Sequence, residues 1–521
     1  MPASPSIDDL MAQDFGTFAD LIRAQAAVRA DKPALIDARR TVTYGELDAL
    51  MDRVACALQR DGVRQAEVAA ICATSSVEYG VAFAGILRAG AIVAPLAPSS
   101  TPESLVVQLK DCGAKLFFLD QGVAQHMAGV LDQVTGTCVS LDGSPAGRPL
   151  EAWLAAPGAT PTPVQIPPDQ GFNIIYSSGT TGAPKGIVQP HIMRWAQVKR
   201  GAYTADAVTM VSTPLYSNTT LVSLLPTLAN GGTAVVMGKF DAGEFLRLSE
   251  AHRATHAMLV PVQYRRIMER PDFDSYDLSS YQLKSSTSAP FSAALKADIL
   301  ARWPGGLVEF YGMTEGGGVC VLACHEHPDK LHTVGRPMPG HDMRLIDEAG
   351  MELPQGEVGE VVGRSGAMML GYHNQPGKTS EAEWVSAEGG RYIRTGDIGR
   401  FDEDGFLTLM DRKKDMIISG GFNIYPSDLE AEIVRHEAVL EAAVVGVASD
   451  AWGETPVAFV ALRPGARIAA ADLRAWVNGK VGKTQRLADL RIVDSLPRSH
   501  IGKILKRELR DGYRPAAAVT A

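Results

Sequence analysis

The sequence predicts a mixed α/β protein with a large N-terminal domain, residues 1–411, and a small C-terminal α/β domain, residues 412–521. Its 521 residues exceed what one hydrophobic core usually organises. Strand patterns alternate with helix patterns up to about residue 330, which predicts parallel sheets with crossover helices. From residue 335 to 409, short apolar runs lie between turns, which predicts antiparallel β structure.

The individual elements follow from local patterns, taken in chain order. Thr43-Tyr-Gly-Glu46 is a capping box that begins a helix with apolar residues at helical spacing. The first series continues with a strand at 68–73, a helix at 81–87 and a strand at 91–96. The second series has helices at 221–228, 245–251 and 291–302, and strands at 233–237, 256–260 and 283–286. Antiparallel strands are expected at 343–346, 358–362 and 406–410; the C-terminal domain has helices at 429–433 and 473–481 and strands at 442–447 and 457–462.

Composition argues against several classes of function. The net charge of −9 disfavours a general nucleic-acid or anionic-membrane binder. The most apolar stretch, 81–96, is broken by Arg88, so no membrane span is expected, and the first twenty residues lack the apolar block of a signal peptide. Six scattered cysteines suit reduced thiols in a cytoplasmic protein, and Cys320, Cys324, His325 and His327 match no standard zinc spacing.

Residues 176–186, Tyr-Ser-Ser-Gly-Thr-Thr-Gly-Ala-Pro-Lys-Gly, form the most informative stretch of the chain. They follow an apolar run, 172–176, that is typical of a buried strand. Glycines let backbone N–H groups approach an anion, the hydroxyls donate hydrogen bonds and Lys185 adds a charge, so the loop suits a polyphosphate. It is not a P-loop, because Pro184 precedes Lys185 and Gly186 follows it. The alternative is a flexible polar surface loop.

Four further motifs follow this loop: Tyr311-Gly-Met-Thr-Glu315, Tyr392-Ile-Arg-Thr-Gly-Asp397, Asp411-Arg412 through Pro426, and Pro497-Arg-Ser-His-Ile-Gly-Lys503. Together the five resemble the adenylate-forming superfamily of acyl-CoA synthetases, peptide-synthetase adenylation domains and firefly luciferase, and most of all the acyl-CoA synthetases. The resemblance covers essentially the whole chain. It implies a large N-terminal domain of two αβ subdomains plus a distorted β-barrel, followed by a small mobile C-terminal domain.

The resemblance implies two half-reactions. A carboxylate attacks the α-phosphate of ATP and gives acyl-adenylate and pyrophosphate, and the thiol of CoA then displaces AMP to give acyl-CoA. Activation is needed because a carboxylate is a poor electrophile, whereas AMP is a good leaving group. Cations and N–H donors must offset the repulsion between the two anions of the first step. The implied cofactors are ATP, Mg²⁺ and coenzyme A.

The resemblance also assigns the nucleotide-binding residues. The β- and γ-phosphates would be held by Ser177, Ser178, Gly179, Thr180, Thr181, Gly182 and Lys185. Glu315 would bind Mg²⁺, since a carboxylate is the hard ligand that this ion prefers, and Thr314 would contact the α-phosphate. Tyr311 and Gly312 would adjoin the adenine, and Asp397 and Arg412 the ribose. The family's Gly-Gly-Ala-Pro segment is Thr287-Ser288-Ala289-Pro290 here, so Ser288 and Ala289 would add side chains beside the base or the acyl carbonyl.

Less specific explanations exist for several of these residues. Glu315 could be an exposed acid after a turn, Asp397 a turn-stabilising aspartate and Tyr311 a core residue. By resemblance, Lys503 is the catalytic lysine that contacts the carboxylate and the α-phosphate; the alternative is a surface lysine near Lys506.

The C-terminal domain is expected to rotate between the half-reactions, because Lys503 cannot stay in place while a thiol enters. The resemblance puts the hinge at Lys414. Gly421, with Gly420, would face the pantetheine tunnel or would simply form a turn. Many relatives have a Lys-Val-Pro segment where this chain has Lys483-Thr-Gln-Arg486-Leu487, so Lys483 and Arg486 are the candidates for the CoA phosphates.

The acyl pocket is expected from residues 214–220, 260–264 and 312–318. Its candidate lining residues are Tyr216, Ser217, Asn218, Val260, Gln263, Gly316 and Gly317. Relatives often have His where Ser217 stands. The glycines at 316–318 either make room for a long or ring-bearing acid or only shape a loop. No cation is evident for a second carboxylate, which favours a medium-chain, long-chain or aromatic monocarboxylic acid.

Other functions are considered beside the acyl-CoA synthetase. One is a stand-alone enzyme that adenylates an amino acid or aryl acid and loads a carrier protein; the amino-acid version would want an Asp in 214–220, and none is present. Oxidative luciferase-type chemistry shares the motifs. A non-catalytic binding protein is disfavoured by the intact set Lys185, Glu315, Asp397, Arg412 and Lys503. The oligomeric state stays open, a homodimer included.

Overall fold

The computed structural model describes residues 5–177, 185–199, 202–412, 415–419, 422–449, 452–482, 485–498 and 503–514. The chain divides into two compact units. The first comprises Met1–His332, Pro337–Asp342 and Arg364–Ile393, and the second Thr333–Arg336, Met343–Gly363 and Arg394–Ala521. The chain therefore passes between the units more than once in the region of residues 333–394.

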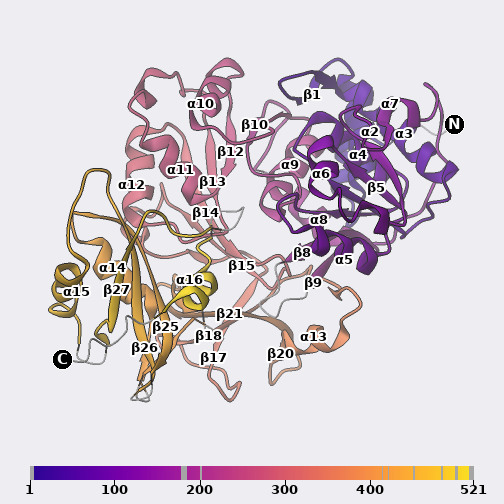
Figure 1. The fold of residues 1–521 in the computed structure, drawn as a ribbon. Helices are drawn as coiled ribbons and strands as arrows, with labels where there is room; N and C mark the ends of the chain where they lie inside the picture. Colours follow the sequence, from indigo (N-terminus) through magenta and orange to yellow (C-terminus); the bar gives the residue numbers. More distant parts are fainter. Residues whose placement is uncertain are drawn as a thin grey trace. The chain divides into compact units, whose positions relative to one another are not determined.

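A nine-stranded sheet runs through the first unit in the order β16-β15-β14-β13-β12-β10-β11-β1-β2 (Figure 1). Its inner strands from β14 to β1 pair in parallel, and the outer strands β15 and β2 pair antiparallel. The strands are β1 Pro33–Ile36, β2 Thr41–Thr43, β10 Val208–Val211, β11 Thr233–Val236, β12 His256–Leu259, β13 Leu283–Ser286, β14 Gly306–Gly312, β15 Val319–Ala323 and β16 Arg336–Pro337.

Four crossover helices accompany this sheet; three confirm the predicted βα series, and α11 was not predicted. They are α9 Asn218–Ala229, α10 Ala242–Ala251, α11 Pro261–Met268 and α12 Ala293–Arg302. In Figure 1, α10, α11 and α12 lie beside β12, β13 and β14. The alternation of strands and helices forces parallel pairing, because each crossover helix returns the chain to the same edge of the sheet.

An eight-stranded sheet forms the rest of the first unit in the order β19-β9-β8-β4-β3-β5-β6-β7. Its strands are β3 Val68–Cys72, β4 Ile92–Pro95, β5 Leu116–Leu119, β6 Thr137–Ser140, β7 Arg148–Pro149, β8 Gly171–Ser177, β9 Lys185–Pro190 and β19 Gly371–Tyr372. The helices in this part of the chain are α1 Ile7–Ala12, α2 Phe18–Arg29, α3 Tyr44–Arg60, α4 Val77–Arg88, α5 Pro102–Cys112, α6 Gln121–His126, α7 Leu150–Trp153 and α8 His191–Val198. The strands from β7 to β8 pair in parallel, as the alternation predicts, whereas β9 pairs antiparallel with β8 and with β19 at one edge of the sheet.

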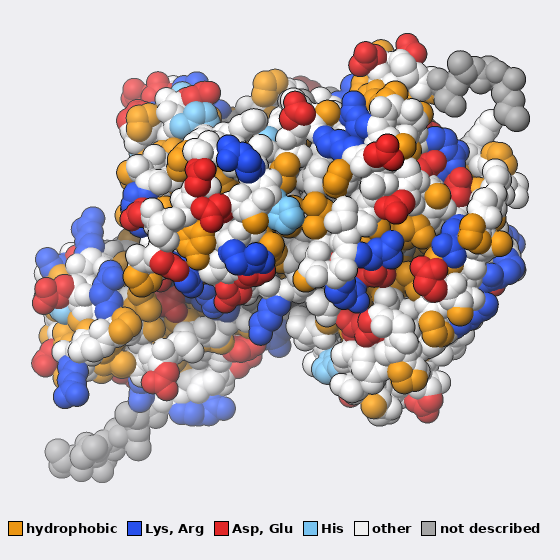
Figure 2. Space-filling model, turned by 90° about the horizontal axis from the view of Figure 1, so that it is seen from above, with side chains coloured by type: hydrophobic (Ala, Val, Ile, Leu, Met, Phe, Trp, Pro, Cys, Tyr) orange, Lys and Arg blue, Asp and Glu red, His pale blue; other side chains and the backbone are white. Residues whose placement is uncertain are grey.

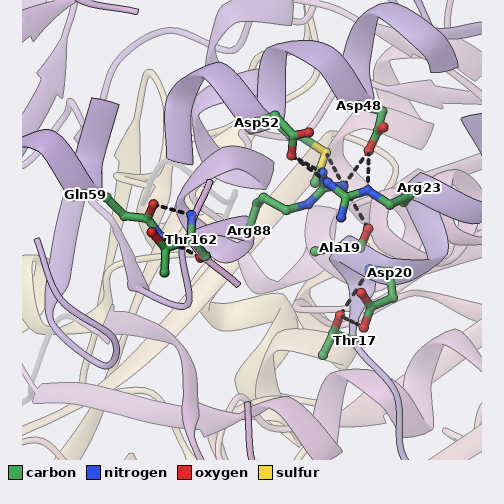
Figure 3. Close-up of polar contacts among 10 residues, drawn as sticks. Thr17, Ala19, Asp20, Arg23, Asp48, Asp52, Gln59, Arg88 and Thr162 are labelled. Carbon is green, nitrogen blue, oxygen red and sulfur yellow. Dashed lines mark hydrogen bonds and ion pairs between the residues drawn. The ribbon is translucent and has the colours of Figure 1, made fainter. Parts of the chain in front are cut away.

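Arg88, which interrupts the apolar run of α4, is buried and forms hydrogen bonds with residues of α2 and α3 (Figure 3). Its guanidinium donates to Asp52 Oδ1 at 2.5 Å, Asp48 Oδ1 at 2.7 Å and the Ala19 carbonyl at 2.9 Å. Asp48 and Asp52 are four residues apart on α3, so both carboxylates face α4. Two carboxylates and a carbonyl compensate the desolvated charge, which fixes α2 and α3 against α4. The capping box predicted at the start of α3 is confirmed, with Thr43 as the N-cap.

The second unit carries the C-terminal αβ elements predicted from the sequence. Its sheet has the order β24-β23-β26-β25, with β27 beside β26. The strands are β23 Ile417–Ser419, β24 Phe422–Ile424, β25 Val439–Ser449, β26 Gly453–Leu462 and β27 Asp489–Val493, and the helices are α14 Pro426–Val434, α15 Ala470–Asn478 and α16 Lys506–Gly512. Leu429, Val444, Val460 and Leu473 are buried in its core.

The region predicted as antiparallel β structure, 335–409, contributes to a five-stranded sheet in the order β17-β18-β21-β20, with β22 beside β21. Its elements are β17 Asp342–Ile346, β18 Gly359–Arg364, β20 Glu383–Val385, β21 Arg391–Phe401 and β22 Leu407–Arg412, with α13 Pro376–Glu381 nearby in the chain. β21 pairs antiparallel with both β20 and β22, as the sequence predicts.

The surface and the thiols match the composition. On the face shown in Figure 2, acidic and basic side chains are interspersed, which does not favour a polyanionic partner there. No helix in the described ranges is long and apolar enough to cross a membrane. All six cysteines are free thiols.

Candidate active site

Four segments of the first unit that carry predicted site residues follow neighbouring parallel strands. Segments 212–218, 260–263, 287–289 and 313–316 come after the carboxyl ends of β10, β12, β13 and β14, which are adjacent in the sheet. Parallel strands end at the same edge, so these segments converge there. Tyr311 and Gly312 are the last residues of β14, opposite Cys320 and Val319 of β15.

The glycine-rich stretch connects the antiparallel strands β8 and β9, in which Ser177 pairs with Lys185. Lys185 Nζ lies 5.0 Å from the centre of the Tyr372 ring, a cation–π contact. The Tyr372 hydroxyl donates to Glu315 Oε1 at 2.8 Å, and burial raises the pKa of this phenol well above its usual range. The structure thus brings the predicted lysine and the predicted metal-binding carboxylate into contact with the same aromatic residue.

Glu315 fits a magnesium site that is completed by substrate phosphates. Its backbone oxygen accepts from Met369 N at 2.9 Å, and one carboxylate oxygen accepts from Tyr372, which orients the group. Within the described part of the chain, no cluster of three or more His, Cys, Asp or Glu residues could hold a metal alone. One carboxylate is what Mg²⁺ commonly takes from a protein when phosphates supply the other ligands.

Four predicted acyl-pocket residues have defined roles in the fold. Ser217 caps α9, with Oγ accepting from Thr219 N at 3.3 Å. Both polar atoms of the Gln263 side chain form hydrogen bonds within the protein. Oε1 accepts from Val260 N at 3.1 Å, and Nε2 donates to the Ser212 carbonyl at 3.1 Å. Asn218 is half-buried, and its Oδ1 accepts from Gln189 at 3.3 Å.

The remaining pocket residues include a buried phenol and a shape-determining glycine. Burial raises the pKa of Tyr216 to about 12, so this phenol is neutral at physiological pH. Gly316 has φ +77°, and a Cβ there would lie 2.9 Å from Met193 Cε. Loop shape alone therefore explains this glycine, which favours the second of the two interpretations given for it. Gly317 is buried beside it.

Ser288 adopts a left-handed conformation, with φ +80°, where a glycine is usual. Its Oγ forms a 2.6 Å hydrogen bond with Thr219 Oγ1 on α9. The bond joins the segment after β13 to the first turn of α9. The side chain that replaces the family's glycine is thus used to bridge two predicted walls of the site, and Ala289 follows it half-buried.

The second unit holds the other predicted residues. Asp397 lies in β21 directly after Gly396, which has φ +69°, and its backbone pairs with Arg412 of β22. The two residues assigned to the ribose are therefore neighbours across one ladder. Lys503 is exposed and immediately precedes Ile504, which forms an isolated bridge with Arg498.

Several predicted residues lie outside the described ranges. They are Ser178, Gly179, Thr180, Thr181, Gly182, Lys414, Gly420, Gly421 and Lys483.

Sequence reasoning missed Tyr372 and Gln189. Tyr372 is part of a two-residue strand that no periodicity marks. Gln189 Nε2 donates to the Thr314 carbonyl at 2.6 Å, although the two residues are 125 positions apart. The only signal for Gln189 was a polar residue within an apolar strand pattern.

His191, the first residue of α8, is expected to weaken the fold in acid. It is 3% exposed, no described residue forms a hydrogen bond with its Nε2, and burial lowers its pKa to about 4. A pKa below the unfolded value means that stability is complete above about pH 6.5 and is lost as the pH falls towards 4. We expect about 2 kcal/mol of this loss between pH 7 and pH 5.

The variant His191→Gln removes this titration. Thermal unfolding midpoints at pH 7 and pH 5 should differ less in His191→Gln than in the wild type. Equal differences in both proteins would contradict the assignment.

The fold and this site define an adenylate-forming enzyme, and comparisons with known proteins agree. Residues 22–373 match the AMP-binding enzyme family, and residues 428–503 match the AMP-binding enzyme C-terminal domain. A 4-coumarate–CoA ligase 5 from Oryza sativa subsp. japonica is 32% identical, covering 97% of this chain and 96% of that protein. A fatty acid–[acyl-carrier-protein] ligase, ScoC from Streptomyces coeruleorubidus, is 32% identical over 92% and 93%.

A solved structure of known activity is similar over nearly the whole chain. The amide bond synthetase McbA from Marinactinospora thermotolerans is 28% identical, with a TM-score of 0.85, and the match covers 95% of this chain and 99% of that one. The chain belongs to the AMP-binding enzyme family. It is an AMP-forming acid–thiol ligase, as the five motifs predict.

Proposed function

We propose that this enzyme joins a monocarboxylic acid to AMP and then transfers the acyl group to the thiol of CoA. An aromatic acid is the favoured substrate; a medium- or long-chain acid is the alternative. The observation that carries the proposal is the contact series Lys185–Tyr372–Glu315 at the end of the β8–β9 hairpin. This series supports the proposal, because a polyphosphate and its metal ion need a cation and an oriented carboxylate close together.

The residues of the chain would divide the work as follows. Lys185 and the loop 177–182 would bind the β- and γ-phosphates, and Thr314 the α-phosphate. Bound Mg²⁺, held by Glu315, would neutralise phosphate charge. Tyr311, Gly312, Ser288 and Ala289 would adjoin the adenine, Asp397 and Arg412 the ribose, and Gly421 the pantetheine. Lys503 would act in the first half-reaction and Lys414 would be the hinge. These assignments are supported by the positions of the described residues in matching motifs.

The relatives support CoA as the acceptor, with two alternatives. The rice relative is named a 4-coumarate–CoA ligase, ScoC is named for a carrier protein and McbA for amide bonds. Loading of a carrier protein gains some support because this chain lacks a Lys-Val-Pro segment before its final motif.

A cytoplasmic location is part of the proposal, supported by the six free thiols. A homodimer stays a prediction, and the molar mass measured by light scattering would test it.

A pyrophosphate-release assay tests the proposal. Purified enzyme is given ATP, Mg²⁺ and a panel of aromatic and aliphatic acids, with and without CoA. We expect pyrophosphate and AMP to be released continuously with CoA, and about one equivalent of pyrophosphate without it. No pyrophosphate with any acid would refute adenylation. If pyrophosphate release becomes continuous only when a carrier protein or an amine is added, that compound and not CoA is the acceptor.

A further inference from the structure

Arg194 of α8 is a buried cation that is solvated by amides. Its side chain is 2% exposed, and no ion pair joins it to a described carboxylate. Its Nε and Nη2 donate to Asn173 Oδ1 at 3.1 and 2.9 Å, Nη1 donates to Gln197 Oε1 at 2.9 Å, and Nη2 also donates to Gln189 Oε1. A buried charge is stable only when such partners are held in place.

Arg194 fixes the orientation of the amides around it. A guanidinium only donates hydrogen bonds, so Asn173 and Gln189 must turn their oxygens towards it. Asn173 Nδ2 then donates to Gln189 Oε1 at 2.9 Å. Gln189 Nε2 faces the other way and donates to the Thr314 carbonyl at 2.6 Å. Because a carbonyl only accepts, this contact confirms the orientation of Gln189 independently.

The same orientation extends to Asn218. Gln189 Nε2 also donates to Asn218 Oδ1 at 3.3 Å, so the Nδ2 group of Asn218 lies on the side away from Gln189. No group in the described residues accepts a hydrogen bond from this Nδ2. Asn218 is half-buried at the start of α9, and it shares the donor Gln189 with Thr314. A donor that the folded chain leaves unpaired can bond to a ligand, and a closed pocket without an acceptor would leave it unsatisfied.

We propose that Asn218 is a specificity-determining residue that donates a hydrogen bond from Nδ2 to an acceptor in the acyl part of the substrate. The substrate class is a carboxylic acid with a ring nitrogen, ether oxygen or carbonyl oxygen within reach of Asn218. Arg194 and Gln189 are positioning residues that keep this donor pointed outward. The inference rests on the proposed function, in which the segment 214–220 is a wall of the acyl pocket.

Isosteric pairs of acids test the proposal in the wild type. Each aryl acid is compared with analogues that carry nitrogen in place of C–H at each ring position, and each straight-chain acid with analogues that carry oxygen in place of one methylene. The measurement is kcat/KM for pyrophosphate release. We expect at least one position at which the acceptor raises kcat/KM about tenfold or more, because a pocket built to hydrogen-bond discriminates against a ligand that cannot. No preference above about threefold at any position would overturn the proposal.

Variants then link the preference to Asn218. Asn218→Asp keeps the shape but replaces the outward donor with an acceptor, so the preference should fall below about threefold or reverse. Gln189→Glu keeps Asn218 but removes the donor that orients it, and the preference should also fall. The ratio of kcat/KM for two acids in one preparation does not depend on the folded fraction, so partial loss of stability would not mimic either result. An unchanged ratio in Asn218→Asp would overturn the proposal.

A matched control lies on the same helix. Asn230 caps the other end of α9, about 18 Å from Asn218 at the helical rise, and donates to the Pro226 carbonyl at 2.9 Å. Asn230→Asp should leave the ratio unchanged.

Failure of the proposed function and failure of this inference give different results. An enzyme that releases no pyrophosphate with any acid lacks the proposed function, whereas one that turns over both members of every pair equally lacks only the specificity assigned to Asn218.

Discussion

Lys503→Ala is expected to lower the rate of acyl-adenylate formation by about 10²–10³, or about 3–4 kcal/mol of transition-state stabilisation. The first half-reaction brings a carboxylate onto an anionic phosphate, and a lysine that contacts both offsets the charge that develops. Thioester formation from supplied acyl-adenylate and CoA does not need this cation, so it should be spared. The two rates are measured separately, as pyrophosphate release and as CoA consumption.

The surroundings of Lys503 make this a test of charge rather than of folding. Its side chain is exposed, and the segment that follows it is held to the second unit, with Leu505 N donating to the Pro497 carbonyl at 2.8 Å and Lys506 paired with Glu430 at 2.8 Å. Arg507→Ala is the matched control, because Arg507 is a nearby cation whose side chain is 68% exposed. Equal loss of both half-reactions in Lys503→Ala would refute the assignment.

Lys414→Pro is expected to have the opposite selectivity. Proline locks φ near −65°, and a hinge works only if its backbone dihedrals can change. If the C-terminal domain must rotate after adenylation, the variant should still release one equivalent of pyrophosphate per enzyme. Thioester formation should fall by about 10² or more, because the second arrangement of the domain is not reached.

Lys414→Ala separates the backbone effect from the loss of the side chain. Alanine keeps φ and ψ free, so both half-reactions should stay within about threefold of the wild type. The amount of acyl-AMP that stays bound to the enzyme gives a second readout, which should rise in Lys414→Pro alone. Full turnover in Lys414→Pro would rule out the hinge.

Local patterns predicted the elements well because their causes are local. The capping box at Thr43, the strand before the glycine-rich loop and the βα series up to residue 330 are confirmed. Helix caps and hydrophobic periodicity act over a few residues, so they can be read without knowing the fold. The antiparallel edge formed by β9 and β19 was not predicted, because β19 has two residues and pairs with a strand almost two hundred positions earlier.

Polar residues in apolar patterns were the hardest to interpret. Arg88 argued only against a membrane span, but in the fold it joins three helices. Arg194 and Gln189 interrupted apolar patterns without any signal of their use. A polar side chain inside the core is explained by its partners, and those partners come from other parts of the chain.

By itself, the sequence determined the order of helices and strands and the class of chemistry, because caps, periodicity and short motifs are written within a few neighbouring residues. Only the tertiary structure decided that Tyr372 orients Glu315 and that Gln189 contacts Thr314. These contacts join residues 57 and 125 positions apart. The physical reason is that sheet order and buried hydrogen bonding depend on the packing of the whole first unit, which no single segment encodes.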